Sequence, residues 1–160
     1  MRSGTVLGVP PSHGPEEVTA VLGPGYAENV SGAHHMWRDY GLAEFFWGRE
    51  AAGQPWQGHH FTLQVHRLAY GDRGTVNPEL RSRYGRFARR LRFARLRALS
   101  ARRGVPLLEV PSPMGAPSYR LFRQPASGVT VTVVAERGPY MRPRGLRPGD
   151  VYAISGTARH

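Results

Sequence analysis

The sequence predicts an α+β protein in which an antiparallel sheet carries its helices on one face. Three observations favour this class: segments where apolar and polar residues alternate, two segments with helix start and stop signals, and Gly- and Pro-rich connections between them. In each half of the chain a helix precedes a group of strands, an order typical of this class. The 160 residues are enough for one domain with its own core.

The first half is expected to hold one short helix and several strands. Pro15 at the first helical position, two acids in the first turn and a closing Gly-Pro predict a helix over 15–23. Aromatic residues over 36–47, interrupted at Gly41, indicate strand with a turn or bulge. Apolar and polar residues alternate over 60–68, which predicts a further strand. Shorter strands are expected at 5–9 and 27–31.

The second half is expected to begin with one long Arg-rich helix over 78–103. Asn77 as the cap and Pro78 at the first position start it, and apolar residues recur every three or four positions from Leu80 to Ala98. Phe93 and Leu96 fall outside that apolar stripe. Strands are then predicted at 106–110, 118–122, 128–134 and 151–155, with 156–160 as a frayed tail. The result is one domain over 1–160, with tandem halves at 1–76 and 77–155.

The charge of the chain is strongly positive and unevenly placed. All 22 cationic side chains are Arg against 11 acids, a net charge of +11. Ten of these Arg lie between Arg81 and Arg103, where no acid occurs. This pattern fits a solvated helix face, a site for an acidic protein partner, or a nucleic-acid surface. No helix-turn-helix, ribonucleoprotein or zinc-finger signature accompanies it.

Several function classes are disfavoured by what the sequence does not contain. Without Cys there is no disulfide framework, thiolate nucleophile or Cys-ligated metal. No apolar stretch approaches the ~20 residues of a membrane span, and no signal-peptide pattern is present, so we expect a cytoplasmic protein. No hydrolase elbow, phosphate loop or dinucleotide fingerprint occurs, so we expect neither an enzyme nor a cofactor.

Two groups of ionisable residues, a set of histidines and a pair of acids, are candidate chemical sites. Five histidines on neighbouring strands suggest a metal site: His34, His35, His59, His60 and His66. However, adjacent residues of a strand point to opposite faces, so we expect no metal there. Asp39 and Glu44 could form a catalytic pair only if a bulge at Gly41 brought them together. The alternative is that each pairs with a nearby Arg. Asp72 and Asp150 are expected in turns.

Several short segments resemble known proteins. These are Leu7–Val9, the Glu16-Glu17-Val18 to Leu22-Gly23-Pro24 stretch, Trp37–Phe45, Phe61–His66, and the later segments 124–129 and 148–155. Together they are similar to small actinobacterial immunity proteins that are encoded beside polymorphic toxins. The order of elements also resembles the tandem helix-plus-strands repeats of the β-lactamase inhibitory protein type. The resemblance implies a binding protein that neutralises a cognate toxin by direct contact.

The candidate binding residues are aromatic and Arg side chains, which dominate interface hot spots. Expected anchors are Trp37, Tyr40, Trp47 and Trp56, with Arg38, Arg49, Arg86, Arg89 and Arg90 as rim or charge-steering residues. Two interpretations are open for Tyr40, Trp47 and Trp56: one of them is exposed in a partner-binding patch, or the aromatic residues form a two-sided core with the helix on one face and loops on the other. The alternative function is a nucleic-acid-binding or regulatory module that acts through the helix 78–103.

Overall fold

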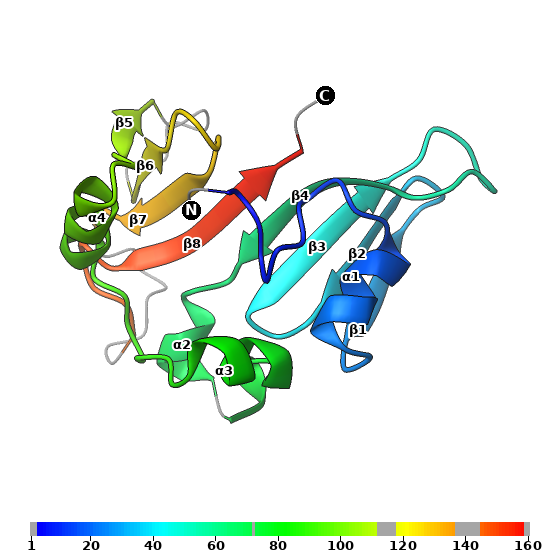
Figure 1. The fold of residues 1–160 in the computed structure, drawn as a ribbon, viewed down its shortest axis with the longest axis horizontal. Helices are drawn as coiled ribbons and strands as arrows, with labels where there is room; N and C mark the ends of the chain where they lie inside the picture. The colour runs from blue at the N-terminus through cyan, green and yellow to red at the C-terminus, as the bar shows by residue number, and fades with distance from the viewer. Residues whose placement is uncertain (1–2, 72, 112–117, 137–144, 159–160) are drawn as a thin grey trace.

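A computed structural model describes residues 3–71, 73–111, 118–136 and 145–158 of the chain. Eight strands form one antiparallel sheet in the order β1-β2-β3-β4-β8-β7-β6-β5, which confirms the α+β class (Figure 1). The strands are β1 (Ala27–Ser31), β2 (His35–Asp39), β3 (Ala43–Gly48), β4 (Gln57–Leu63), β5 (Leu108–Val110), β6 (Tyr119–Arg123), β7 (Thr130–Val134) and β8 (Val151–Thr157).

The two groups of four strands meet in the middle of the sheet. Strand β8 lies beside β4, with Phe61 opposite Gly156 and Thr62 opposite Ser155. A side chain at Gly156 would clash with the Phe61 ring, because a Cβ there would lie 2.5 Å from it. The C-terminal strand therefore joins the first half of the sheet to the second half.

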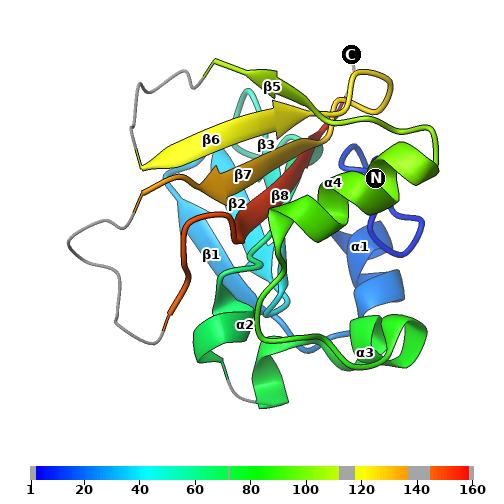
Figure 2. The same cartoon turned by 90° about the vertical axis from the view of Figure 1, so that its left-hand side faces the viewer.

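The described helices lie on one face of this sheet, except the short second helix, which follows the end of β4 and contacts side chains of both faces (Figures 1 and 2). They are α1 (Pro15–Leu22), α2 (Arg67–Tyr70), α3 (Pro78–Tyr84) and α4 (Phe93–Arg102), with a short 3₁₀ turn at Arg73–Thr75. Val18 of α1 and Leu80 of α3 pack into one core cluster with Phe45 and Trp47. A second cluster joins Phe93 of α4 to strands β6 to β8. No helix of the described residues is long and apolar enough to cross a membrane.

The prediction of one long helix over 78–103 is wrong, because the structure has two helices there. Helix α3 ends at Tyr84, where Gly85 adopts a left-handed φ of +74°. The backbone regains helical form only after Arg92. Between them, the Phe93 amide donates to the Gly149 carbonyl and the Val151 amide to the Leu91 carbonyl. These bonds to the start of β8 hold the segment outside a helix.

The break also changes which residues are buried. Leu80 belongs to the first core cluster, whereas Leu91, Phe93 and Leu96 belong to the second. Phe93 is 9% exposed and its ring centre lies 4.1 Å from that of Phe122. The residues that a single helical wheel places off the apolar stripe are thus the ones that fix α4 to the sheet.

Three smaller predictions also differ from the structure. Residues 5–9 form a tight turn closed by a Val6–Val9 bridge, not a strand of the sheet. The strand predicted over 60–68 ends at Leu63, and α2 follows. Strand β8 continues to Thr157, which pairs with His60, so the tail prediction is wrong for 156–157. Asp72 and residues 159–160 lie outside the described residues.

Candidate partner-binding surface

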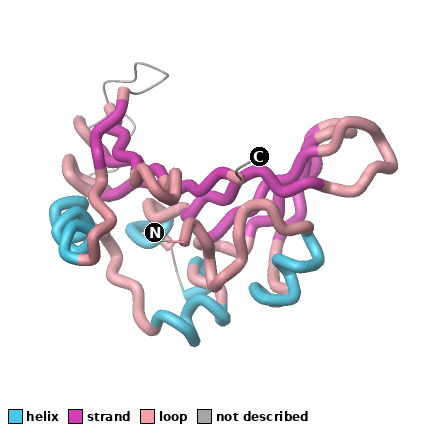
Figure 3. The backbone as a smooth tube through the Cα atoms, turned by 45° about the horizontal axis from the view of Figure 1, so that its top comes forward, coloured by secondary structure: helices cyan, strands magenta, loops and turns pink. Residues whose placement is uncertain are grey.

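Helices α1, α3 and α4 leave the second face of the sheet uncovered, and we call it the open sheet face (Figure 3). Since side chains alternate along a strand, the residues between the core positions point to this face. The strand registers align one row of them across all eight strands: Ala27, Asp39, Glu44, Thr62, Ser155, Thr130, Arg123 and Leu108. This row is polar over most of its length.

A second row on the open sheet face is aromatic. Trp37, Phe46 and His60 lie opposite one another on β2, β3 and β4. The Trp37 and Phe46 ring centres are 6.2 Å apart, those of Phe46 and His60 are 4.1 Å apart, and both pairs are stacked. All three rings are partly exposed. This aromatic row is therefore an apolar surface that is held rigid by stacking and is partly exposed to solvent.

Beside the aromatic row, Arg67 binds two carboxylates. Its Nη1 donates to both carboxylate oxygens of Asp39 at 2.9 Å, and its Nη2 donates to Glu44 at 2.5 Å. Gln64 also donates to Glu44 at 2.5 Å. Burial acts to lower the pKa of Arg67, but the Glu44 and Asp39 carboxylates raise it above its usual value. The two acids thus act as the ligands of one guanidinium.

Asp39 and Glu44 lie on the same face of the sheet because of a hairpin turn, not because of a bulge at Gly41. They are opposite each other in the β2–β3 hairpin, whose tight turn is closed by a hydrogen bond from the Tyr40 amide to the Ala43 carbonyl. Gly41 takes a φ of +87° in that turn, and a side chain there would meet the Thr75 carbonyl. The expectation that a regular strand separates the two acids is wrong, because the chain reverses between them.

His59 and His60 also depart from the expected alternation. The register of β3 and β4 shifts between Phe46 and Trp47, and the two imidazole rings lie 4.5 Å apart with Nδ1 atoms at 2.7 Å. Burial, together with the neighbouring His59, lowers the pKa of His60 to about 4. Across the described residues, no three His, Asp or Glu side chains gather as a metal site would require.

A third group on the sheet surrounds His66. Its ring stacks on Tyr152 with centres 4.4 Å apart, and Tyr152 meets Tyr119 edge to face at 5.0 Å. The Nδ1 atom of His66 is buried and has no hydrogen-bond partner among the described residues. Burial and the adjacent Arg67 lower the pKa of His66, so the ring is neutral at pH 7.

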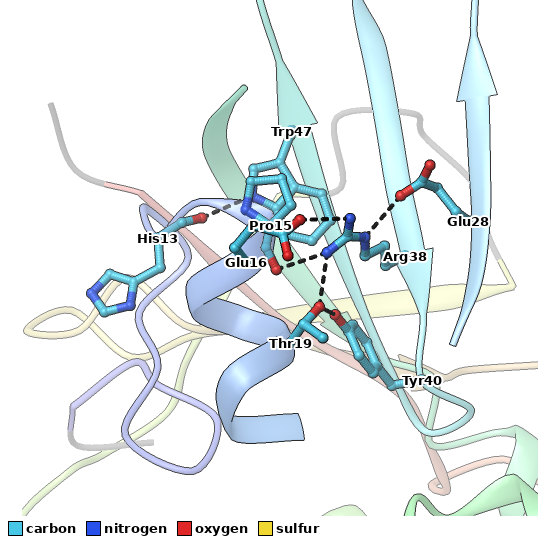
Figure 4. Close-up of polar contacts among 8 residues, drawn as sticks. All are labelled: His13, Pro15, Glu16, Thr19, Glu28, Arg38, Tyr40 and Trp47. Atoms are coloured by element: carbon cyan, nitrogen blue, oxygen red, sulfur yellow. Dashed lines mark hydrogen bonds and ion pairs between the residues drawn. The ribbon is translucent and has the colours of Figure 1, made fainter. Parts of the chain in front are cut away.

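Three of the expected binding residues lie in the core instead. Trp47 is fully buried, Tyr40 is 2% exposed and Arg38 is 7% exposed. Trp47 donates its indole N–H to the His13 carbonyl, and the Tyr40 hydroxyl bonds to Thr19 (Figure 4). The prediction that Tyr40 or Trp47 is exposed is wrong, because both are on the helix-covered face of their strands.

Arg38 ties α1 to the sheet. Its guanidinium donates to Glu28 of β1 at 2.9 Å and, on α1, to Glu16 at 3.0 Å, the Pro15 carbonyl at 2.9 Å and the Thr19 hydroxyl at 2.8 Å (Figure 4). It also lies 4.4 Å from the centre of the Tyr26 ring. Burial opposes its charge, but the Glu28 and Glu16 bonds raise the pKa of Arg38. Arg38 is a structural residue.

Arg49 and Trp56 form a pair at the connection between β3 and β4. The Arg49 guanidinium lies 4.0 Å from the centre of the Trp56 ring, and its Nε donates to the Ala33 carbonyl. Trp56 is half-buried against the first core cluster. Trp37 is the expected anchor that the structure places on the open sheet face.

Arg86, Arg89 and Arg90 lie between α3 and α4. The segment that joins these two helices runs on the helix side of the sheet (Figure 2). All three Arg side chains are exposed. Arg90 lies 3.8 Å from buried Asp150, and Arg92 binds the same carboxylate at 3.0 Å. The cations and the aromatic row are therefore on different sides of the sheet.

No protein-family model, curated protein or solved structure matches this chain.

Sequence reasoning overlooked Phe46 and Arg67, which the open sheet face brings beside Trp37. The signal that could have found them is the hairpin register: once Gly41 is taken as the turn, Trp37 faces Phe46 and Asp39 faces Glu44.

Proposed function

We propose that this protein is an immunity-type binding protein, and that it neutralises a cognate bacterial toxin by docking its open sheet face on it. The observation that carries the proposal is the aromatic row Trp37, Phe46 and His60 on the sheet face that α1, α3 and α4 leave uncovered. Rigid, partly exposed aromatic rings are typical anchors of protein interfaces. The resemblance to immunity proteins supports the same conclusion.

The size of the face suits such a role. Eight strands about 4.8 Å apart and about 17 Å long present on the order of 600 Å². A standard stable interface takes about 800 Å² from each partner, so the open sheet face would supply most of that area and its bordering loops the rest. The Arg67–Asp39–Glu44 cluster would supply a polar contact beside the rings.

The separation of rings and cations disfavours the nucleic-acid alternative. A single-stranded nucleic-acid platform interleaves stacking rings with positive charges that follow the backbone. Here the rings lie on the open sheet face, whereas Arg86, Arg89 and Arg90 lie on the segment between the helices. The helix that the alternative needed is also broken at Gly85.

The test is neutralisation by co-expression with the product of the adjacent reading frame. The protein should restore growth to cells that express that product, and Trp37→Ser with Phe46→Ser should abolish the rescue. A matched control is Tyr84→Ser, which removes an aromatic ring that is 57% exposed on the helix side. Rescue that survives the double variant would refute the docking surface, and failure of the wild type to rescue would refute the function.

A further inference from the structure

A groove of about 770 Å³ lies beside α3, on the helix side of the sheet. It is lined by residues from α2, the 3₁₀ turn, α3 and the segment that follows Gly85: Leu68, Gly71, Thr75, Val76, Arg81, Arg86, Phe87 and Arg89. Its volume is within the range of pockets that bury a ligand of drug size or a short peptide stretch.

The lining combines an apolar floor with a cationic rim. Val76 is buried in the first core cluster, and Leu68 and Phe87 pack against that cluster. Arg81, Arg86 and Arg89 are exposed around this floor, and the lining residues that the structure describes include no carboxylate. A guanidinium donates two parallel hydrogen bonds to a carboxylate, so the rim is suited to acidic groups.

The buried acid nearest this segment pairs with cations other than Arg86 and Arg89. Asp150 is fully buried and takes Arg90 and Arg92 as its partners. No ion pair joins Arg86 or Arg89 to another described residue. The segment is thus fixed at its Arg90–Arg92 end, while Arg86 and Arg89 face the groove.

We propose that this groove binds an acidic peptide segment of a protein partner, with an apolar side chain on the floor between carboxylates on the rim. The floor provides the apolar contact, and the guanidinium groups of Arg86 and Arg89 provide charge complementarity. A nucleic-acid strand fits less well, because Phe87, the aromatic residue of the described lining, packs against the core and is not presented for base stacking. This site lies apart from the open sheet face and does not depend on the toxin.

The experiment uses the full-length protein and a fluorescein-labelled synthetic peptide with a central Leu flanked by Glu and Asp, read by fluorescence anisotropy. Arg86→Gln with Arg89→Gln should weaken binding at least about tenfold. The matched control, Arg95→Gln with Arg102→Gln, removes the same charge from exposed positions of α4 and should change binding less than about twofold. Replacing the central Leu by Ser should also weaken binding.

Three results would overturn the proposal. Equal weakening by both double variants would mean diffuse attraction to net charge. Equal binding of the Leu and Ser peptides would mean that the floor is not used. Tighter binding of a single-stranded oligonucleotide of matched charge would assign the cations to nucleic acid. Because the probe is synthetic, none of these results bears on neutralisation of a toxin.

Discussion

Asp39 and Glu44 lie directly opposite each other in the β2–β3 hairpin, and Arg67 binds both carboxylates. Two like charges on neighbouring strands would otherwise destabilise the hairpin. Arg67 comes from α2, which follows β4, so the contact also fixes the turn between β4 and α2. A charge pair that could serve as a catalytic dyad is thereby held as a structural cluster on the open sheet face.

Arg67→Met should therefore lower the free energy of unfolding by about 2–3 kcal/mol, because it leaves two partly buried carboxylates without their cation. Urea unfolding followed by Trp fluorescence measures the change. Adding Asp39→Asn and Glu44→Gln to this variant should recover part of the loss. A single variant that stays within about 0.5 kcal/mol of wild type would contradict this account.

Substitution of Arg38 should destabilise the folded protein more than substitution of an exposed Arg. Arg38→Lys keeps the charge but cannot satisfy four acceptors around a planar fork, so we expect a loss of about 1–3 kcal/mol in thermal or urea unfolding. Arg95→Lys on the exposed side of α4 is the matched control and should change stability by less than about 0.5 kcal/mol. Equal effects of the two substitutions would remove the proposed role of Arg38.

The pKa of His60 predicts a loss of stability in mild acid. The folded state holds this imidazole neutral down to a pKa of about 4, whereas the unfolded chain protonates near the ordinary value of 6.5. The unfolded state therefore binds more protons below pH 6.5, and stability should fall as pH drops from 6.5 to 4. His60 is partly exposed, so solvent screening reduces its contribution to roughly 1–2 kcal/mol.

Urea midpoints measured between pH 7 and pH 4 test this prediction. The pKa values of His59 and His66 are also lowered, so part of the slope should remain in His60→Gln. The variant should nevertheless show a shallower decline than wild type over the same range. An unchanged slope would mean that His60 protonates equally in the folded and unfolded states.

The Asp150 carboxylate should stabilise the position of the segment that precedes α4. Asp150→Asn removes the charge that binds Arg92 and Arg90, and we expect a loss of about 2–3 kcal/mol because the site is fully buried. Hydrogen exchange at the Phe93 and Val151 amides should accelerate, since these donate to Gly149 and Leu91. Unchanged exchange at both amides would show that the segment is held without this carboxylate.

The strands were largely predictable from the sequence, whereas the helix break was not. Period-2 alternation located β7 and the second half of β4, and the short apolar segment 151–155 located β8. A single Gly in a helical pattern costs only about 1 kcal/mol, so Gly85 by itself does not exclude a continuous helix. The hydrogen bonds of Leu91 and Phe93 to residues 149–151 decide the outcome, and they join residues far apart in the chain.

The candidate site was only partly predictable for a similar reason. Aromatic residues occupy both faces of β3, so composition does not distinguish the buried Trp47 from the partly exposed Phe46. Only the position of the α1 and α3 helices decides which face is covered. Of these candidate anchors, Trp37 lies partly exposed on the open sheet face, whereas Tyr40 and Trp47 lie beneath the helices.

The most direct test of the central claim is titration calorimetry with the purified product of the adjacent reading frame. Wild type and the Tyr84→Ser control should bind with the same affinity and one-to-one stoichiometry, whereas Trp37→Ser with Phe46→Ser should lose at least about a hundredfold. Circular dichroism of the double variant confirms that it is folded. Full affinity in the folded double variant, or no heat of binding with wild type, would contradict the account.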